Sequence, residues 1–159
     1  MSDARVGFGY DAHRFGGEGP VVLAGVQIGY HTGVIGTSDA DVASHAVCDA
    51  LLGAGALGDL GEFFPSDDPR WRGADSTEFI SACARMVREA GFEIGNIDVT
   101  VVAQSVRVSP HRQAMRENLA AALGLPVGHV SVKATSTDGL GWIGSGEGLA
   151  AHAVVAIYS

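Results

Sequence analysis

The run Leu149–Tyr158 (LAAHAVVAIY) constrains the fold most, because it is a strand-like apolar segment without obvious polar alternation. A strand of this composition is typically buried on both faces, so it needs cover from two sides. Four other short apolar segments also have the pattern of strands, and glycines interrupt the first two. These four segments are residues 5–11, 20–30, 94–104 and 130–137.

Three segments between the strands have the apolar spacing of helices. They are residues 39–57, 76–90 and 110–123. Asp39, Asp75 and Ser109 are the expected N-caps, since aspartate and serine side chains accept hydrogen bonds from the first free amides of a helix. Residues 58–76 are rich in proline, glycine and aspartate, so we expect a loop without regular structure there.

This order of elements predicts an α+β fold of one domain over residues 1–159. We expect a two-layer sandwich, in which helices cover one face of a mixed four-stranded sheet. The other face then carries apolar residues without cover. A homo-oligomer that packs sheet against sheet would bury it.

Composition excludes several classes of function. The formal net charge of −8 argues against nucleic acid as a partner. There is no apolar run of the roughly 20 residues that a membrane-spanning helix needs, and no signal-peptide core, so we expect a cytoplasmic protein. Cys48 and Cys83 are interpreted as buried thiols. An acidic protein that binds a phosphorylated small molecule must neutralise it locally, for example with metal ions.

The segment Gly7–Phe15 (GFGYDAHRF) raises the possibility of a metal site. Asp11 and His13 lie two residues apart on a predicted strand and therefore share one face. Alone, this pair is more often an incidental polar pair beside a turn. His45 lies one turn into the first helix, and its neighbour Asp41 fits an ordinary helix start equally well. One carboxylate and two imidazoles would leave the fourth position of Zn²⁺ open, as a catalytic site requires.

The remaining histidines lie in other contexts, and each is interpreted as a solvated or hydrogen-bonded side chain. They are His31, His111, His129 and His152.

Three segments carry a resemblance to a known family. GYDAHRF (9–15), SDADVASHAVCDALLGAGALGDLGEFFPSDDPRW (38–71) and KATSTDGLGWIGSGEG (133–148) resemble the signature segments of the 2-C-methyl-D-erythritol 2,4-cyclodiphosphate synthases. The resemblance extends over nearly the whole chain. It implies a homotrimer whose sheets pack around the threefold axis, with active sites between subunits. The implied reaction cyclises 4-diphosphocytidyl-2-C-methyl-D-erythritol 2-phosphate, a small-molecule cytidine diphosphate substrate, and releases CMP.

The resemblance also implies roles for individual residues. Zn²⁺ is held by Asp11, His13 and His45, and a second cation, Mg²⁺ or Mn²⁺, by Asp138. Thr37 and Ser136 occupy catalytic positions. The implied substrate contacts are Asp11, Ala12, His13, Thr37, Ser38, Asp59, Leu60, Gly61, Phe64, Pro65, Ser66, Asp67, Asp68, Ala103, Gln104, Ser105, Val106, Arg107, Val108, Ser109, Ala134, Thr135, Ser136, Thr137, Asp138, Trp142 and Ser145.

Several positions depart from the family pattern. Thr37 stands where a histidine usually helps to place the phosphates, and threonine offers no cationic donor. The other departures are Ser66 for an aspartate, Arg107 for a lysine, Trp142 for a smaller residue, Ser145 for an arginine and Asp138 for a glutamate. Three alternatives therefore stay open: a zinc-binding homologue with lost catalysis, a cyclase for another nucleotide diphosphate, and a purely structural trimer.

Overall fold

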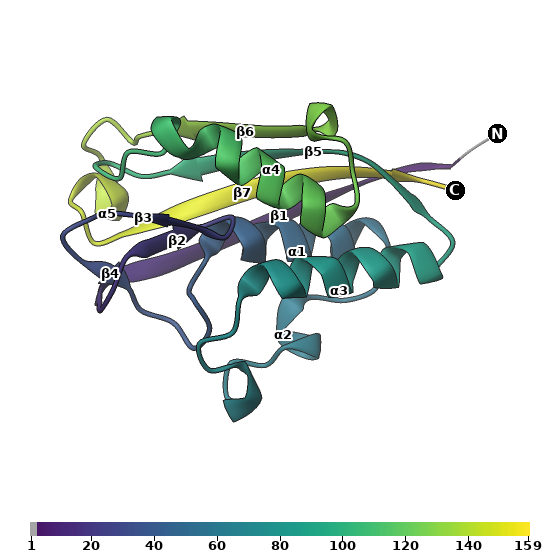
Figure 1. Cartoon of the computed structure of the whole chain (residues 1–159), viewed down its shortest axis with the longest axis horizontal. Coiled ribbons are helices and arrows are strands. Elements are labelled where there is room, and N and C mark those ends of the chain that lie inside the picture. The colour runs from purple at the N-terminus through teal and green to yellow at the C-terminus, as the bar shows by residue number, and fades with distance from the viewer. Residues whose placement is uncertain (1–2) are drawn as a thin grey trace.

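The computed structural model describes residues 3–159 and has two layers, with helices covering one face of a mixed sheet (Figure 1). The order of strands in the sheet is β4-β1-β7-β5-β6. Only the neighbours β5 and β6 run parallel; the other pairs are antiparallel. The strands of this sheet are β1 (Ala4–Gly17), β4 (Gly33–Val34), β5 (Glu93–Val102), β6 (Val130–Thr135) and β7 (Gly148–Tyr158). The α+β sandwich is confirmed, whereas the sheet has five strands and not the predicted four.

The difference arises in the segment 20–30, which was expected to form one strand. It folds into the separate hairpin β2 (Val21–Leu23) and β3 (Val26–Ile28). The two turn residues, Ala24 and Gly25, have φ values of 49° and 73°. Two successive residues with positive φ are the geometry of a tight hairpin turn. The short fifth strand, β4, then pairs with the end of β1.

The helices are α1 (Val42–Ala54), α2 (Leu60–Phe63), α3 (Ser76–Glu89), α4 (Arg112–Leu123) and α5 (Gly141–Gly144). Short 3₁₀ turns occupy Pro69–Trp71, Ser109–His111 and Val127–His129. The segment 58–76 therefore contains α2 and a 3₁₀ turn, contrary to the prediction of an unstructured loop.

The predicted caps are confirmed for one helix and wrong for two. Asp75 caps α3 by accepting a hydrogen bond of 2.9 Å from Thr77 N. Helix α1 starts after Asp41 and not at Asp39, because the Asp41 carboxylate accepts from Ser44 N at 2.9 Å. The Ser109 side chain makes no capping bond, since a 3₁₀ turn precedes α4.

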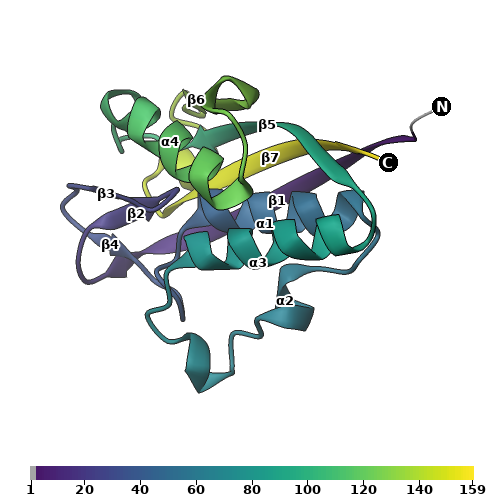
Figure 2. The same ribbon diagram turned by 45° about the vertical axis from the view of Figure 1, so that its right-hand side comes forward.

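Helix α1 lies between the sheet and α3 and is buried along most of its length (Figures 1 and 2). It approaches β1 closely because the facing residues are small. A Cβ atom on Gly9 would lie 2.8 Å from both the carbonyl carbon of Ala46 and the amide nitrogen of Ala50. Gly7 faces Ala50 and Ala54 in the same way. This seam fixes the distance between the two elements that carry the candidate metal ligands.

The face of the sheet opposite the helices is apolar and exposed along β1 and β7, as predicted. Val6 is 69% and Phe8 62% exposed, and the neighbouring Val154 is 41% exposed. In the single chain, β7 is thus buried on its helix-facing side only. The sequence predicts that both faces of β7 are buried, and burial of the second face requires contact with another chain.

Two sequence-based expectations concern the whole chain. In the described range 3–159, the structure contains no helix of the length and apolarity that a bilayer crossing requires. Cys48 and Cys83 are both buried and free, as predicted.

Candidate metal centre and substrate pockets

Asp11, His13 and His45 converge on one point between β1 and α1. Asp11 Oδ2 lies 2.9 Å from His45 Nδ1 and 3.0 Å from His13 Nε2, and the two imidazole nitrogens are 3.4 Å apart. Their ligand atoms all lie within 4.8 Å of one another. The prediction that these three side chains come together is confirmed. One carboxylate and two imidazoles form a donor set suited to a divalent transition metal.

Buried hydrogen bonds set the start of α1 and hence the position of His45. Besides capping the helix, the Asp41 carboxylate accepts from Ala24 N at 2.9 Å and Gly25 N at 2.8 Å in the β2–β3 turn. The Ser44 hydroxyl donates to it as well, at 2.8 Å. Because this carboxylate is fully buried and so well satisfied, it anchors the helix to the hairpin.

The remaining ring nitrogen of each histidine has its own partner. His13 Nδ1 lies 2.9 Å from the carbonyl oxygen of Ile35. A carbonyl can only accept, so Nδ1 carries a hydrogen, and Nε2 is the ring nitrogen that faces Asp11 and is left for a metal. His45 Nε2 lies 2.8 Å from Ser76 Oγ and 3.2 Å from Ser38 Oγ. Such outer contacts orient metal-binding histidines.

The pKa values of the group reflect its mutual interactions in the metal-free protein. Burial raises the pKa of Asp11, but hydrogen bonds with His13 and His45 and their charges outweigh it and lower the pKa to about 2. Burial lowers the pKa of His13, yet the hydrogen bond and the charge of Asp11 outweigh it and raise the pKa above 6.5. A carboxylate is therefore available for a cation at any ordinary pH.

A pocket of about 190 Å³ opens beside the two histidines. Its polar end includes His13, His45, Thr37 and Ser38, and its other end is a wall of Leu60, Phe64, Trp71 and Phe79, with Gly61 and Ser66 also lining it. Phe64 stacks on Phe79 at a ring separation of 4.3 Å, and Trp71 packs edge-on against both. Of the predicted substrate contacts, seven line this pocket: His13, Thr37, Ser38, Leu60, Gly61, Phe64 and Ser66.

Other predicted residues near this pocket are engaged in local structure. The Thr37 hydroxyl donates to the carbonyl of Ser66 at 2.9 Å. The Asp59 carboxylate caps α2 through Glu62 N at 3.1 Å. Asp68 pairs with Arg70, while Pro65 is half-buried and Asp67 exposed on the same loop. Thr37 thus ties the loop Phe64–Asp68 to the irregular segment that precedes α1.

A second pocket, of about 270 Å³, lies where β5 and β6 end. The predicted residues that line it are Ala103, Val106, Arg107, Val108, Ser109, Ala134 and Thr135. Gln104 reaches from this region to Gly139 N at 3.0 Å and holds the loop after β6, whereas Ser105 is exposed. The lining of this pocket differs throughout from that of the first, so the predicted substrate contacts of one chain do not gather in a single pocket.

The loop after β6 carries Ser136, Thr137 and Asp138. Asp138 has a φ of 56° and is exposed, and its amide donates to Ser136 Oγ at 3.2 Å. Further on, Trp142 lines a third pocket, of about 210 Å³, with Ala12 and His13. The Ser145 hydroxyl contacts Glu147 Oε2 at 3.2 Å. Lys133, a possible phosphate ligand by sequence, instead pairs with Asp98 at 2.7 Å.

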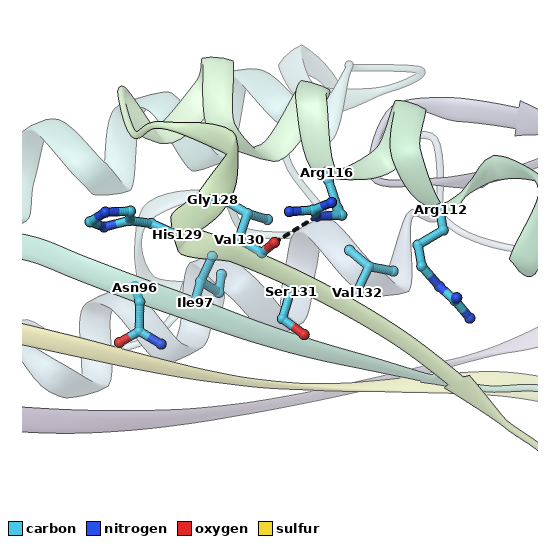
Figure 3. A pocket seen from close by; sticks show the side chains of 9 residues that line it. All are labelled: Asn96, Ile97, Arg112, Arg116, Gly128, His129, Val130, Ser131 and Val132. Carbon is cyan, nitrogen blue, oxygen red and sulfur yellow. Dashed lines mark hydrogen bonds between the residues drawn. The ribbon is translucent and has the colours of Figure 1, made fainter.

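A larger groove, of about 390 Å³, lies between α4 and the β5–β6 edge (Figure 3). Figure 3 shows Arg112 and His129 pointing toward opposite ends of this groove. Arg116 donates to the carbonyl oxygens of Val130 at 2.8 Å and Val127 at 3.0 Å. Its cation thus holds the start of β6 in place, and the polar groups of the groove do not converge on a ligand.

The sequence interpretation missed the outer partners of the histidines. Ser76 and the Ile35 carbonyl contact the two rings, and Asp39 accepts hydrogen bonds from Ser76. Ser76 follows a capping aspartate, so its pattern indicated only a helix start. A backbone carbonyl such as that of Ile35 leaves no signal in sequence.

The fold and the site together define a small α+β protein with a candidate metal centre of one aspartate and two histidines. Comparison with known proteins narrows this class. The profile of the YgbB family matches residues 4–158, and the chain belongs to this family.

Three relatives illustrate the match. The 2-C-methyl-D-erythritol 2,4-cyclodiphosphate synthase of Erwinia tasmaniensis is 49% identical over 150 residues, which cover 94% of this chain and 96% of that protein. The bifunctional IspDF of Campylobacter jejuni superimposes with a TM-score of 0.96 at 42% identity over 99% of this chain, which spans only 43% of that longer protein. A CDP complex of IspF from Plasmodium falciparum gives a TM-score of 0.84 at 28% identity, covering 97% and 95% of the two chains.

Proposed function

We propose that the protein converts 4-diphosphocytidyl-2-C-methyl-D-erythritol 2-phosphate to 2-C-methyl-D-erythritol 2,4-cyclodiphosphate and CMP. The protein is then a phosphorus–oxygen lyase that acts in isoprenoid precursor biosynthesis by the non-mevalonate pathway. A single domain over residues 1–159 carries this activity. The observation that carries this proposal is the convergence of Asp11, His13 and His45 beside a pocket, in a chain about half identical to synthases of this name. The two free, buried cysteines support a reducing, cytoplasmic location.

The reaction is a phosphoryl transfer within one substrate molecule. An oxygen of the 2-phosphate bonds to the β-phosphorus, the bond from that phosphorus to the bridging oxygen breaks, and CMP leaves with the bridging oxygen. Such reactions depend mainly on positioning and on neutralising phosphate charge. Zn²⁺ bound by Asp11, His13 and His45 would supply Lewis-acid polarisation, and Mg²⁺ or Mn²⁺ bound by Asp138 would supply charge for the leaving CMP.

The chain's own groups bind and orient the substrate. Ser38, at the polar end of the first pocket, is suited to contact a phosphate through its hydroxyl group, and Leu60 and Gly61 border the aromatic wall where a methylerythritol unit fits. Thr135 lines the second pocket and Ser136 follows it in the chain, so both are suited to contact the diphosphate. In that pocket, backbone groups of residues 103–109 bind the cytosine ring.

Two features support the proposal of a homotrimer with active sites between subunits. The metal triad and the pocket assigned to cytidine have different linings in one chain, so a neighbour that brings its second pocket to the first would complete the site. The apolar, helix-free face of the sheet supplies a surface for such packing. The same assembly would give β7 its missing cover.

One observation favours an alternative. The Thr37 hydroxyl is engaged with Ser66 and provides no cation at a position assigned to catalysis. A homologue that binds zinc and the nucleotide with little turnover, or a cyclase for another nucleotide diphosphate, would fit this feature. We therefore keep both as outcomes of the test.

The test is ³¹P NMR of the purified protein with the cytidine substrate, Zn²⁺ and Mg²⁺. CMP and a cyclic diphosphate are expected together, and His45→Ala and Asp138→Ala should abolish both signals. Unchanged substrate with a folded, zinc-loaded protein would refute the synthase activity. Turnover of the corresponding ADP or UDP compound in its place would identify a cyclase of different specificity.

A further inference from the structure

Ser76 is a buried polar residue that the proposed reaction does not use directly. It is the first residue of α3 and is completely inaccessible to solvent. Its hydroxyl oxygen lies 2.8 Å from His45 Nε2. The same hydroxyl donates to the carboxylate of Asp39, which also accepts from Ser76 N at 3.0 Å. Asp39, Ser76 and His45 thus form a continuous chain of hydrogen bonds that ends at the metal centre.

The chemistry of these groups fixes the direction of each bond. An ionised carboxylate can only accept, so the hydrogen of the Ser76 hydroxyl points to Asp39. The lone pairs of Ser76 Oγ are then free to accept, and His45 Nε2 must carry the donated hydrogen. His45 Nδ1 faces Asp11 Oδ2 at 2.9 Å and is hydrogen-bonded to it in the metal-free protein, so a bound metal would take the place of that hydrogen.

Helix capping does not account for this arrangement. Asp75 caps α3 through Thr77 N, so the Ser76 side chain is not needed for that purpose. Ser38 lies 3.2 Å from His45 Nε2 and 3.3 Å from Ser76 Oγ. Because the Ser76 hydrogen goes to Asp39, Ser38 is the donor in its contact with Ser76, and Ser76 Oγ accepts from both His45 and Ser38.

We propose that Ser76, oriented by Asp39, is a positioning residue that fixes the ring and the tautomer of His45 for metal binding. This inference rests on the proposed metal centre and extends it to two residues outside the triad. The two histidines then differ in how they are held: the backbone at Ile35 holds His13, whereas side chains hold His45. Only the side-chain partners of His45 can be removed by an amino-acid substitution.

Outer partners of metal-binding histidines typically contribute 10–100-fold to metal affinity. We expect Ser76→Ala to weaken Zn²⁺ binding by a factor in about this range. Asp39→Asn keeps an oxygen that can accept from Ser76, so its affinity should fall between those of Ser76→Ala and the unchanged protein. Ser81→Ala is the matched control, because Ser81 lies exposed on the same helix and its hydroxyl contacts only its own helix.

The experiment is a competition titration of the metal-free protein with Zn²⁺ and a chelator, with thermal unfolding as a check of the fold. Long-range ¹H–¹⁵N NMR of the zinc-loaded protein reports which ring nitrogen of His45 carries the hydrogen. We expect the Nε2–H form, with Nδ1 on the metal, in the unchanged protein and a mixture in Ser76→Ala.

The outcomes separate the two proposals. Failure of the unchanged protein to bind Zn²⁺ would overturn the metal centre itself. Normal zinc binding together with unchanged affinity and tautomer in Ser76→Ala would overturn the positioning role alone. If Ser76→Ala does not fold, the affinity and tautomer of Asp39→Asn decide, and values equal to those of Ser81→Ala would overturn the inference.

Discussion

The close approach of α1 to β1 makes Gly9 a sensitive position for the candidate metal centre. Gly9→Ala adds one methyl group, which would lie 2.8 Å from the carbonyl carbon of Ala46 and from the amide nitrogen of Ala50. Ordinary contacts between such atoms begin near about 3.5 Å. Both obstacles are helix backbone, which cannot turn aside as a flexible side chain can. The helix must therefore recede from the strand.

The size of this movement can be compared with the tolerance of the site. Restoring ordinary contact requires a displacement of roughly 0.7 Å, and the even closer Ala46 carbonyl oxygen requires more. Metal–ligand distances tolerate about 0.2 Å. Because His45 lies on α1 and Asp11 on β1, the displacement separates two of the three ligands. We expect zinc affinity to fall at least about 100-fold and stability to fall by about 1–3 kcal/mol.

The assay is zinc competition together with urea unfolding, and Gly53→Ala is the matched control. Gly53 is an exposed position of α1, and a Cβ there would meet no other atom within 4 Å. Removing a helical glycine should stabilise that variant by about 0.5–1 kcal/mol and leave zinc binding unchanged. Gly9→Ala protein with the zinc affinity of Gly53→Ala would show that the seam does not set the ligand geometry.

Three further predictions concern stability and assembly. Asp41→Ala should cost about 3 kcal/mol or more in urea unfolding, because it removes a helix cap and leaves buried donors at Ala24 and Gly25 unpaired; a loss below about 1 kcal/mol would contradict the anchoring role. In the metal-free protein, the lowered pKa of Asp11 and the raised pKa of His13 add stability between about pH 4 and 6.5. The contribution of Asp11 to the free energy of unfolding, about 2 kcal/mol, is lost as the pH falls toward 2, and that of His13 is lost as the pH rises through its raised pKa. Unfolding measured over a pH series should show both losses, and Asp11→Asn should flatten the dependence of stability on pH. Phe8→Asp places a charge on the exposed, helix-free face of the sheet and should convert the proposed trimer to monomers in light scattering. An unchanged mass would exclude this face as the interface.

The sequence predicted the ligand set more accurately than its surroundings. Asp11 and His13 are two residues apart on a strand, and that spacing alone places them on one face. Asp39 and Asp41, by contrast, are equally good caps in isolation. Only the contact of Asp41 with the β2–β3 turn decides between them.

Other features depend on contacts between distant residues and escaped prediction for that reason. The turn of the β2–β3 hairpin requires Ala24 at a positive φ, a conformation that alanine seldom adopts. Ser76 meets His45 only because α3 packs beside α1. The distribution of the predicted substrate contacts over separate pockets is likewise a property of the packed chain.

The two ends of the described chain lie together at one end of the sheet, away from Asp11. At one end, Ser159 N donates to the Asp3 carbonyl at 3.1 Å, so β1 begins where β7 finishes (Figure 1). Asp11 lies about 23 Å further along β1 than Ala4. An additional domain joined at either end would therefore sit away from the metal centre and its pocket. This layout makes the fold easy to combine with other enzymes in one polypeptide, and the bifunctional Campylobacter jejuni protein contains the same fold within a longer chain.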